Sequence, residues 1–433
     1  MRRLFATVLL CVLLHAPFAC GQTEDGYSTK KRIARIRQLG KSNPGAIPTL
    51  TQYLTDPDTS IRVEAVQAIV KLDSAASLDP LIKAAHDNNA EVQIRATDGL
   101  VNFYLPGYVA KGLTGPLTRG VRQVKSFFSS RNEQEIPPDI AIRQDVGQAL
   151  SDQILHGASL DARANAARAA GILRAGPAVA SLQQALRSKD TELILESLYA
   201  LQKIGDRSAG SGVSFLARDL DDRVQMAALE TLGVLRNEQS ASDVRSALTH
   251  ARNAKIRRAA LSTLSMLGQP ADRKIFQQYA SDSDPALRAS ALEGLGRVRE
   301  PEDTPVLEEA YNEQNADWRV HFAAAFALVD EGKIDTGEFS PLRYLVDNLE
   351  IKERESVAEA YLKELCRRDD VRRAVFPLIS NATRDQKVAL SNILGASESQ
   401  DAVPALTKLS QDINPDVALA ASRALRMLQA RKL

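Results

Sequence analysis

The chain has 433 residues, of which 44% are hydrophobic, 25% are charged and only 5% are aromatic. This balance is that of a folded protein rich in helix-forming residues, and it excludes a disordered chain. The formal net charge of +1 gives no sign of a surface that binds nucleic acid, so we expect no nucleic-acid partner.

The first 20 residues have the pattern of an export signal. Arg2 and Arg3 form a short basic region, and residues 4–14 form an apolar run that is too short to span a bilayer. No later segment has the uninterrupted apolar length of a membrane-spanning helix. We therefore expect an exported protein that is periplasmic or associated with the cell envelope.

The end of this segment, Ala19-Cys20-Gly21, resembles a bacterial lipoprotein signal, in which a small residue precedes the cysteine that becomes lipidated. Pro17 departs from the leucine that is usual three residues before that cysteine. Two outcomes therefore stay open: a lipid on Cys20, which would be the only membrane attachment, or ordinary cleavage nearby. Cys366 is the one later cysteine, and we expect it to pack as a small hydrophobic residue.

From residue 32 onward the chain repeats itself about every 31 residues, as at residues 221–233, 253–268 and 284–296. Ten copies share three aligned columns. The first holds mostly small residues, the second, three positions later, also holds mostly small residues, and the third, four positions after the first, holds mostly large apolar residues. The first column reads Ala65, Ala96, Ala166, Ser197, Ala228, Ala260, Ala291, Phe322, Ala389 and Ala421.

Positions i, i+3 and i+4 share one face of a helix, so the columns predict like helices stacked side by side. An amphipathic stretch lies upstream of each, for example at residues 46–54, 178–186, 241–248 and 403–409. Each repeat is therefore predicted to contain a helix A, a short loop and a helix B. Helix starts are indicated by Asp56-Pro57, Asp284-Pro285 and Asn414-Pro415, and helix ends by Gly205, Gly268 and Gly296.

The repeats resemble HEAT repeats, particularly the short two-helix form named after phycobilisome lyases. The resemblance implies an all-α, right-handed α-solenoid of about eleven repeats. It also implies an arginine near the start of helix B that takes part in a hydrogen-bonded ladder between repeats. This column matches at Arg62, Arg163, Arg257, Arg288 and Arg319. It departs at Gln93, Ile194, Gln225, Gln386 and Ala418, where we expect the ladder to be interrupted.

Two breaks in the period define the domain organisation. Repeats 1 and 2 occupy residues 32–104, an insert occupies residues 105–138, and further repeats occupy residues 139–433. Between residues 329 and 385 we expect one degenerate repeat, with its helices at residues 342–349 and 355–365. The insert contains a predicted amphipathic helix that is either a packed connector, a partner-docking helix or a membrane-surface helix. Its candidate binding residues are Leu117, Arg119, Val121, Arg122, Val124, Lys125 and Phe128.

No catalytic, cofactor-binding or metal-binding constellation is visible in the sequence, so we expect no enzyme activity and no cofactor. The four histidines beyond the signal, His86, His156, His250 and His321, neither adjoin a glutamate nor recur at a spacing of four. Deoxyhypusine hydroxylase, which also uses HEAT-like repeats, binds iron through His-Glu pairs, and this chain has none. The many acidic residues before helix B are expected to cap helices.

These observations predict an extracytoplasmic scaffold that binds an unidentified protein partner on a concave surface lined by helix B. The alternatives are an enzyme or chromophore-handling protein of the lyase-like class, and a membrane-attached lipoprotein assembly factor. The helix-B positions expected to be exposed on that surface are Glu64, Arg95, Asn165, Arg168, Glu196, Tyr199, Glu230 and Glu293.

Overall fold

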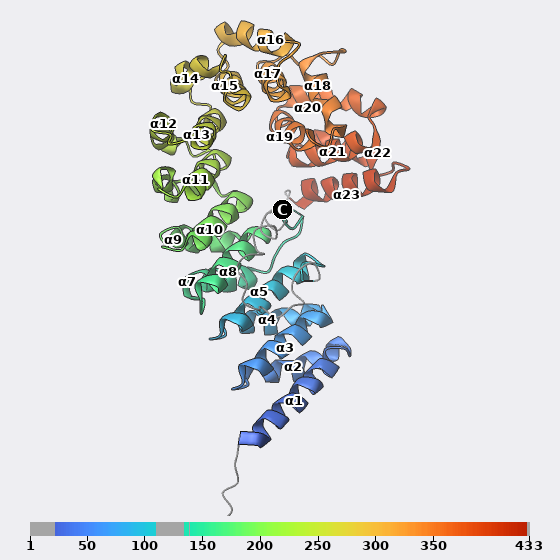
Figure 1. The fold of residues 1–433 in the computed structure, drawn as a ribbon. Helices are drawn as coiled ribbons and strands as arrows, with labels where there is room; N and C mark the ends of the chain where they lie inside the picture. The colour runs from blue at the N-terminus through green and yellow to red at the C-terminus, as the bar shows by residue number, and fades with distance from the viewer. Residues whose placement is uncertain (1–21, 110–133, 138, 431–433) are drawn as a thin grey trace, which may run out of the picture.

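Helices alone build the part of the chain that the computed structural model describes, which is residues 22–109, 134–137 and 139–430, and no strand occurs there. The helices pair, and the pairs stack into an arc that curls until its C-terminal end approaches the middle of the chain (Figure 1). This architecture confirms the predicted α-solenoid. Among the described helices none has both the length and the apolar character needed to cross a bilayer.

Each repeat contains a helix A followed by a helix B, which is usually longer. The A helices are α2 (Ile47–Gln52), α4 (Leu78–Ala85), α7 (Gln144–His156), α9 (Val179–Ala185), α12 (Ala241–Thr249), α14 (Arg273–Tyr279), α16 (Thr304–Asn312), α18 (Pro341–Asp347), α20 (Asp369–Val375) and α22 (Val403–Leu409). The B helices are α3 (Thr59–Leu72), α5 (Ala90–Tyr104), α8 (Leu160–Ile172), α10 (Thr191–Ile204), α11 (Asp222–Val234), α13 (Ala254–Leu267), α15 (Pro285–Val298), α17 (Trp318–Asp330), α19 (Glu355–Leu365), α21 (Arg384–Ala396) and α23 (Pro415–Ala430).

The fifth repeat departs from this plan, because two 3-10 segments, Arg207–Gly212 and Ser214–Arg218, replace its helix A. The glycines and serines of this stretch are poor helix formers, which is consistent with the replacement. A further helix, α1 (Gln22–Leu39), precedes the first repeat and packs on α3. The predicted degenerate repeat is confirmed, since α18 and α19 lie where its two helices were expected.

The small column is the seam along which B helices stack. All ten of its members are at most 2% exposed, including Phe322, which stands where the other repeats have alanine or serine. The large residues four positions later are also buried, apart from Leu425, which is partly buried. In the second small column Asn392 is exposed and departs from the pattern. The repeat register read from the sequence is therefore the packing register of the solenoid.

Helix boundaries follow most of the predicted caps. Asp284 caps α15 with Pro285 at its first position, and Gly205 and Gly268 end α10 and α13 in the left-handed conformation, with φ of 72° and 60°. The prediction for Asp56 was wrong, because Asp58 caps α3 two residues later. Asp56 instead accepts a hydrogen bond from the backbone N–H of Asp58 at 2.9 Å.

Gly296 was also predicted wrongly, as the end of a helix. It lies inside α15, where a Cβ atom would come within 2.4 Å of the Cβ of Ala327 on α17. The glycine is therefore required by the close approach of two stacked B helices and not by a turn. In sequence the two requirements look alike, because both place a glycine near the C-terminal end of an amphipathic helix.

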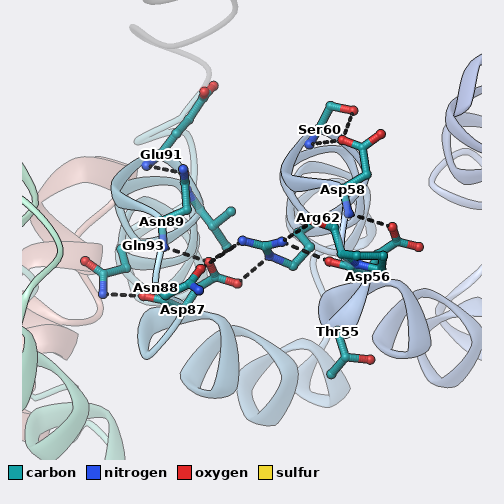
Figure 2. Close-up of polar contacts among 12 residues, drawn as sticks. Thr55, Asp56, Asp58, Ser60, Arg62, Asp87, Asn88, Asn89, Glu91 and Gln93 are labelled. Atoms are coloured by element: carbon teal, nitrogen blue, oxygen red, sulfur yellow. Dashed lines mark hydrogen bonds and ion pairs between the residues drawn. The ribbon is translucent and has the colours of Figure 1, made fainter. Parts of the chain in front are cut away.

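The first rung of the predicted ladder joins repeats 1 and 2 through Arg62 (Figure 2). Its guanidinium donates to the Asp87 carboxylate at 2.7 and 3.0 Å and to the Asn88 side chain at 3.0 Å, and it also donates to the carbonyl oxygen of Asp56 at 2.9 Å. Both partners of the ion pair are about nine-tenths buried. One side chain thus ties the A–B loops of two consecutive repeats together.

The expected interruption of the ladder at Gln93 and Gln225 was wrong. Gln93 donates to the carbonyl oxygen of Asp87 at 2.6 Å and accepts from the backbone N–H of Ala158 at 2.8 Å. Gln225 donates to the carbonyl oxygen of Ala217 in its own repeat at 2.8 Å and accepts from the Arg252 side chain of the next repeat at 2.8 Å. An amide carries both a donor and an acceptor, so glutamine can bridge two loops as arginine does.

Candidate binding groove on the concave surface

The inner side of the arc between α8 and α17 is formed by B helices, with the A helices outside (Figure 1). A groove with a volume of about 560 Å³ runs across this inner side, over α10, α11, α13 and α15. It is lined by Gln202, Met226, Glu230, Val234, Lys255, Arg258, Ala259, Ser262, Thr263, Met266, Ala286 and Ser290.

Three apolar side chains, Met226, Val234 and Met266, give the groove a hydrophobic and adaptable lining. Val234, the last residue of α11, is 45% exposed. Gly233 makes room for Met266, since a Cβ atom at residue 233 would lie 2.8 Å from the methionine sulfur. Flexible thioether side chains suit a surface that adapts to a bound polypeptide.

Charged groups flank this apolar lining. Lys255 and Arg258 stand on α13, and Arg258 pairs with Asp284 at 2.6 Å. Glu230 of α11 lies between Met226 and Val234, and desolvation in the groove raises its pKa. A polypeptide with apolar side chains and polar flanks would find matching chemistry along this groove.

Helix α19 reaches across the curl of the solenoid and contacts the repeats that carry the groove. Its Glu364 pairs with Arg236, just after α11, at 2.7 Å and with Arg297 of α15 at 3.0 Å. Arg297 also pairs with Glu293 at 2.9 Å, and the hydroxyl of Tyr361 donates to the Glu293 carboxylate. We call these five residues the cross-array latch.

The latch is an electrostatically tuned cluster. Burial alone would raise the pKa of Glu364, but the charges and hydrogen bonds of Arg297 and Arg236 outweigh it and lower the pKa to about 2. Burial and the neighbouring Glu293 carboxylate raise the pKa of Tyr361 well above its usual range. Glu364 is therefore ionised and Tyr361 neutral at physiological pH, which is the combination that the observed bonds require.

Several concave positions predicted to be exposed are buried instead. Glu64 is 9% exposed and pairs with Arg37 at 3.0 Å. Arg37 belongs to α1, a helix that the sequence did not predict. Arg168 and Glu196 form an ion pair at 2.8 Å with both side chains less than a tenth exposed. Asn165 is also buried. Arg95 and Tyr199 are partly buried, as is Glu293 in the latch, and Glu230 is exposed as expected.

The amide of Asn165 donates to Asp98 at 3.2 Å, which links repeats 2 and 3 next to the Arg168–Glu196 pair. Neighbouring repeats thus satisfy the polar groups that sequence patterning alone would assign to solvent. One oxygen of Glu196, Oε2, has no hydrogen-bond partner among the described residues.

The predicted lipidation residue Cys20 and the candidate insert residues Leu117, Arg119, Val121, Arg122, Val124, Lys125 and Phe128 lie outside the described residues. The end of the insert is described at residues 134–137. There the N–H of Ile136 donates to the carbonyl oxygen of Ile172 at 3.0 Å, and Lys203 donates to the carbonyl oxygen of Gln134 at 3.1 Å. The insert therefore rejoins the array at the C-terminal ends of α8 and α10.

Chemistry-bearing side chains are dispersed over the described part of the chain. No group of three or more histidine, cysteine or acidic side chains there has the arrangement of a metal site. Cys366 is fully buried in the C-terminal core, as predicted, and burial raises the pKa of its thiol to about 12. A thiol in this state is protonated at neutral pH and is a poor nucleophile. The groove is the feature best suited to binding.

Comparison with known proteins identifies the repeats. The HEAT-repeat family matches residues 21–101, 213–280 and 273–329. No curated protein matches the chain. Similar solved structures include an engineered protein, with 17% identity over 88% of this chain and 98% of that one and a TM-score of 0.38.

Two further solved structures are similar. Human deoxyhypusine hydroxylase has 18% identity over 58% of this chain and 96% of its own, with a TM-score of 0.28. The CpcE–CpcF phycocyanin lyase of a Nostoc species has 18% identity over 66% of this chain and 88% of that one, with a TM-score of 0.30. Superpositions this poor carry no information on function. The repeat register, the stacked helix pairs and the family match together identify residues 21–101 and 213–329 as HEAT repeats.

Proposed function

We propose that the protein is an extracytoplasmic scaffold that holds a partner polypeptide in the concave groove over α11, α13 and α15. The observation that carries the proposal is the apolar lining of Met226, Val234 and Met266 with charged groups on its flanks. An exposed apolar strip on the inner side of a repeat array is where such proteins offer an extended binding surface.

The latch supports a polypeptide ligand over a small molecule. In the same repeats, α19 already lies as a helix against α15, where its Glu364 pairs with Arg297 and with Arg236, two residues beyond the groove residue Val234. The concave surface therefore already binds one helix of the same chain that carries an acidic side chain. A partner segment with apolar and acidic side chains would make the same kinds of contact along the open part of the groove.

The extracytoplasmic location is part of the proposal. It is supported by the basic and apolar pattern of residues 1–20 and by the lipoprotein-like Ala19-Cys20-Gly21 sequence. Fractionation of cells that produce the full chain tests it directly. Recovery of the processed protein in the envelope or periplasmic fraction is expected, and an unprocessed chain in the cytoplasm would contradict it.

Site-specific photo-crosslinking tests the groove. A photoreactive phenylalanine analogue at residue 234 in the groove is compared with the same analogue at residue 306, because Val306 on the outer helix α16 is 37% exposed. We expect one defined polypeptide to be captured at residue 234, and its capture to be lost when Met226→Glu and Met266→Glu are added. Equal capture from both positions, or none from residue 234, would refute the groove as the binding site.

A further inference from the structure

The N-terminal end of the described array carries an unusual concentration of positive charge. Between residues 22 and 55 the sequence contains six basic residues and two acidic ones, Glu24 and Asp25, although the whole chain is almost neutral. The six are Lys30, Lys31, Arg32, Arg35, Arg37 and Lys41. Five of them stand on α1 and the sixth follows directly after it.

Helix α1 turns one face to the first repeat and the opposite face to solvent. Ile36 is fully buried against the array. Because successive helix residues are 100° apart, Lys30, Ala34 and Arg37 form a single stripe of α1 away from Ile36. All three are exposed, as is Lys41 in the turn that follows the helix. Ile33 and Ala34 form an apolar strip within a shallow hollow that Lys30, Arg37 and Lys41 border.

Only part of this charge is neutralised inside the protein. Arg32 pairs with Asp56, and Arg37 pairs with Glu64 at 3.0 Å while its side chain stays 61% exposed. Among the side chains that the structure describes, which begin at residue 28, no acidic group pairs with Lys30, Arg35 or Lys41. A polar outer face on a terminal helix would suffice to keep a repeat array soluble, but that role does not require an excess of positive charge.

We propose that the outer face of α1 docks on an anionic membrane surface. Clustered lysines and arginines are attracted to acidic lipid headgroups, and an apolar strip between them can enter the interface. The predicted lipidation residue Cys20 precedes the first residue of α1 by two positions. A lipid at this position would bring α1 to the bilayer first, and the basic face would supply the second attachment that stable anchoring needs.

Vesicle binding by the chain from Gly21 onward, which carries no lipid, tests the face by itself. We expect binding to vesicles that contain phosphatidylglycerol, weakening with added salt, and no binding to vesicles of phosphatidylcholine alone. The double variant Lys30→Gln, Lys41→Gln should lower the affinity by about five-fold for each charge removed, hence on the order of 25-fold.

The matched control is Lys274→Gln, Lys408→Gln, which removes the same charge from exposed lysines on the outer helices α14 and α22. It should leave vesicle binding nearly unchanged. Equal losses in both double variants, equal binding to neutral vesicles, or no binding to anionic vesicles would overturn the proposal. The outcome is independent of the groove, because none of these four lysines lines it.

Discussion

The interfaces on the two sides of α17 differ in the size of the side chains that meet there. On one side, α15 approaches so closely that Gly296 faces Ala327 without room for a single added carbon. On the other side, Phe322 and Phe326 face the C-terminal repeats, and the Phe326 ring lies 4.7 Å from the Tyr361 ring of α19. Small residues permit stacking, whereas aromatic rings hold the next helix away.

This difference divides the apolar interior into two cores that share α17. Ala323, Ala324 and Ala327 belong to the N-terminal core, while Phe322 and Phe326 belong to the C-terminal one. A single phenylalanine in the small column therefore marks the place where the regular stack changes direction. The altered direction brings α19 against the concave surface of earlier repeats, where the latch forms.

The largest effect is expected from removing the Phe322 ring between α17 and the C-terminal repeats. Phe322→Ala should lower the free energy of unfolding by about 3–5 kcal/mol, because the ring is fully buried and its loss leaves a cavity between the two cores. Denaturant titration measures this loss. The control is Phe339→Ala, whose ring is 83% exposed and whose loss should cost less than about 0.5 kcal/mol. Similar denaturation midpoints for the two variants would show that the Phe322 ring has no structural role.

The latch should respond to pH with a defined sign. The pKa of Glu364 is lowered in the folded state from its usual 4.5 to about 2, so ionised Glu364 stabilises the fold fully above pH 4.5, and this stabilisation disappears as the pH falls toward 2. Glu364→Gln should cost about 2–3 kcal/mol at neutral pH, and the difference from wild type should shrink in acid.

Glu308→Gln removes the carboxylate of a half-exposed pair with Lys333 and provides the matched comparison for the latch. Its cost should stay below about 0.5 kcal/mol at every pH. A pH-independent difference between wild type and Glu364→Gln, measured from urea unfolding curves, would mean that Glu364 is not ionised in the latch.

A smaller effect is expected at the tight interface. Gly296→Ala should destabilise the fold by about 1–2 kcal/mol, because the forced separation of α15 and α17 exceeds the gain in helix propensity. Gly176→Ala is the same chemical change at a position with open space around it, and it should be neutral or slightly stabilising. Thermal unfolding of the two variants decides the matter, and equal melting temperatures would contradict the packing role of Gly296.

The fold was largely predictable because repeat packing is local. The small columns and the two-helix unit follow from residues about 31 positions apart, and the degenerate repeat at α18 and α19 follows from a gap of about two periods between Phe322 and Ala389. Glutamine in the arginine column was misread, since residue type alone does not show that Gln93 and Gln225 still bridge two loops. The burial of Glu64 was missed because nothing in the repeat pattern indicated α1.

The candidate site was less predictable, because it depends on contacts across the curl. Arg297 and Glu364 are 67 positions apart, and Arg426 and Asp139, which pair at 3.0 Å near the C-terminal end, are 287 positions apart. No periodicity links such residues. The concave surface could be assigned to helix B from the sequence, but not the part of it that α19 occupies.

Small-angle X-ray scattering of wild type and Glu364→Arg tests the central claim most directly, namely that the cross-array latch holds the array in a curl. Arginine at residue 364 would face Arg236 and Arg297, and like charges should expel α19. We predict a larger radius of gyration for Glu364→Arg at unchanged helix content by circular dichroism. Superimposable scattering curves would contradict the account.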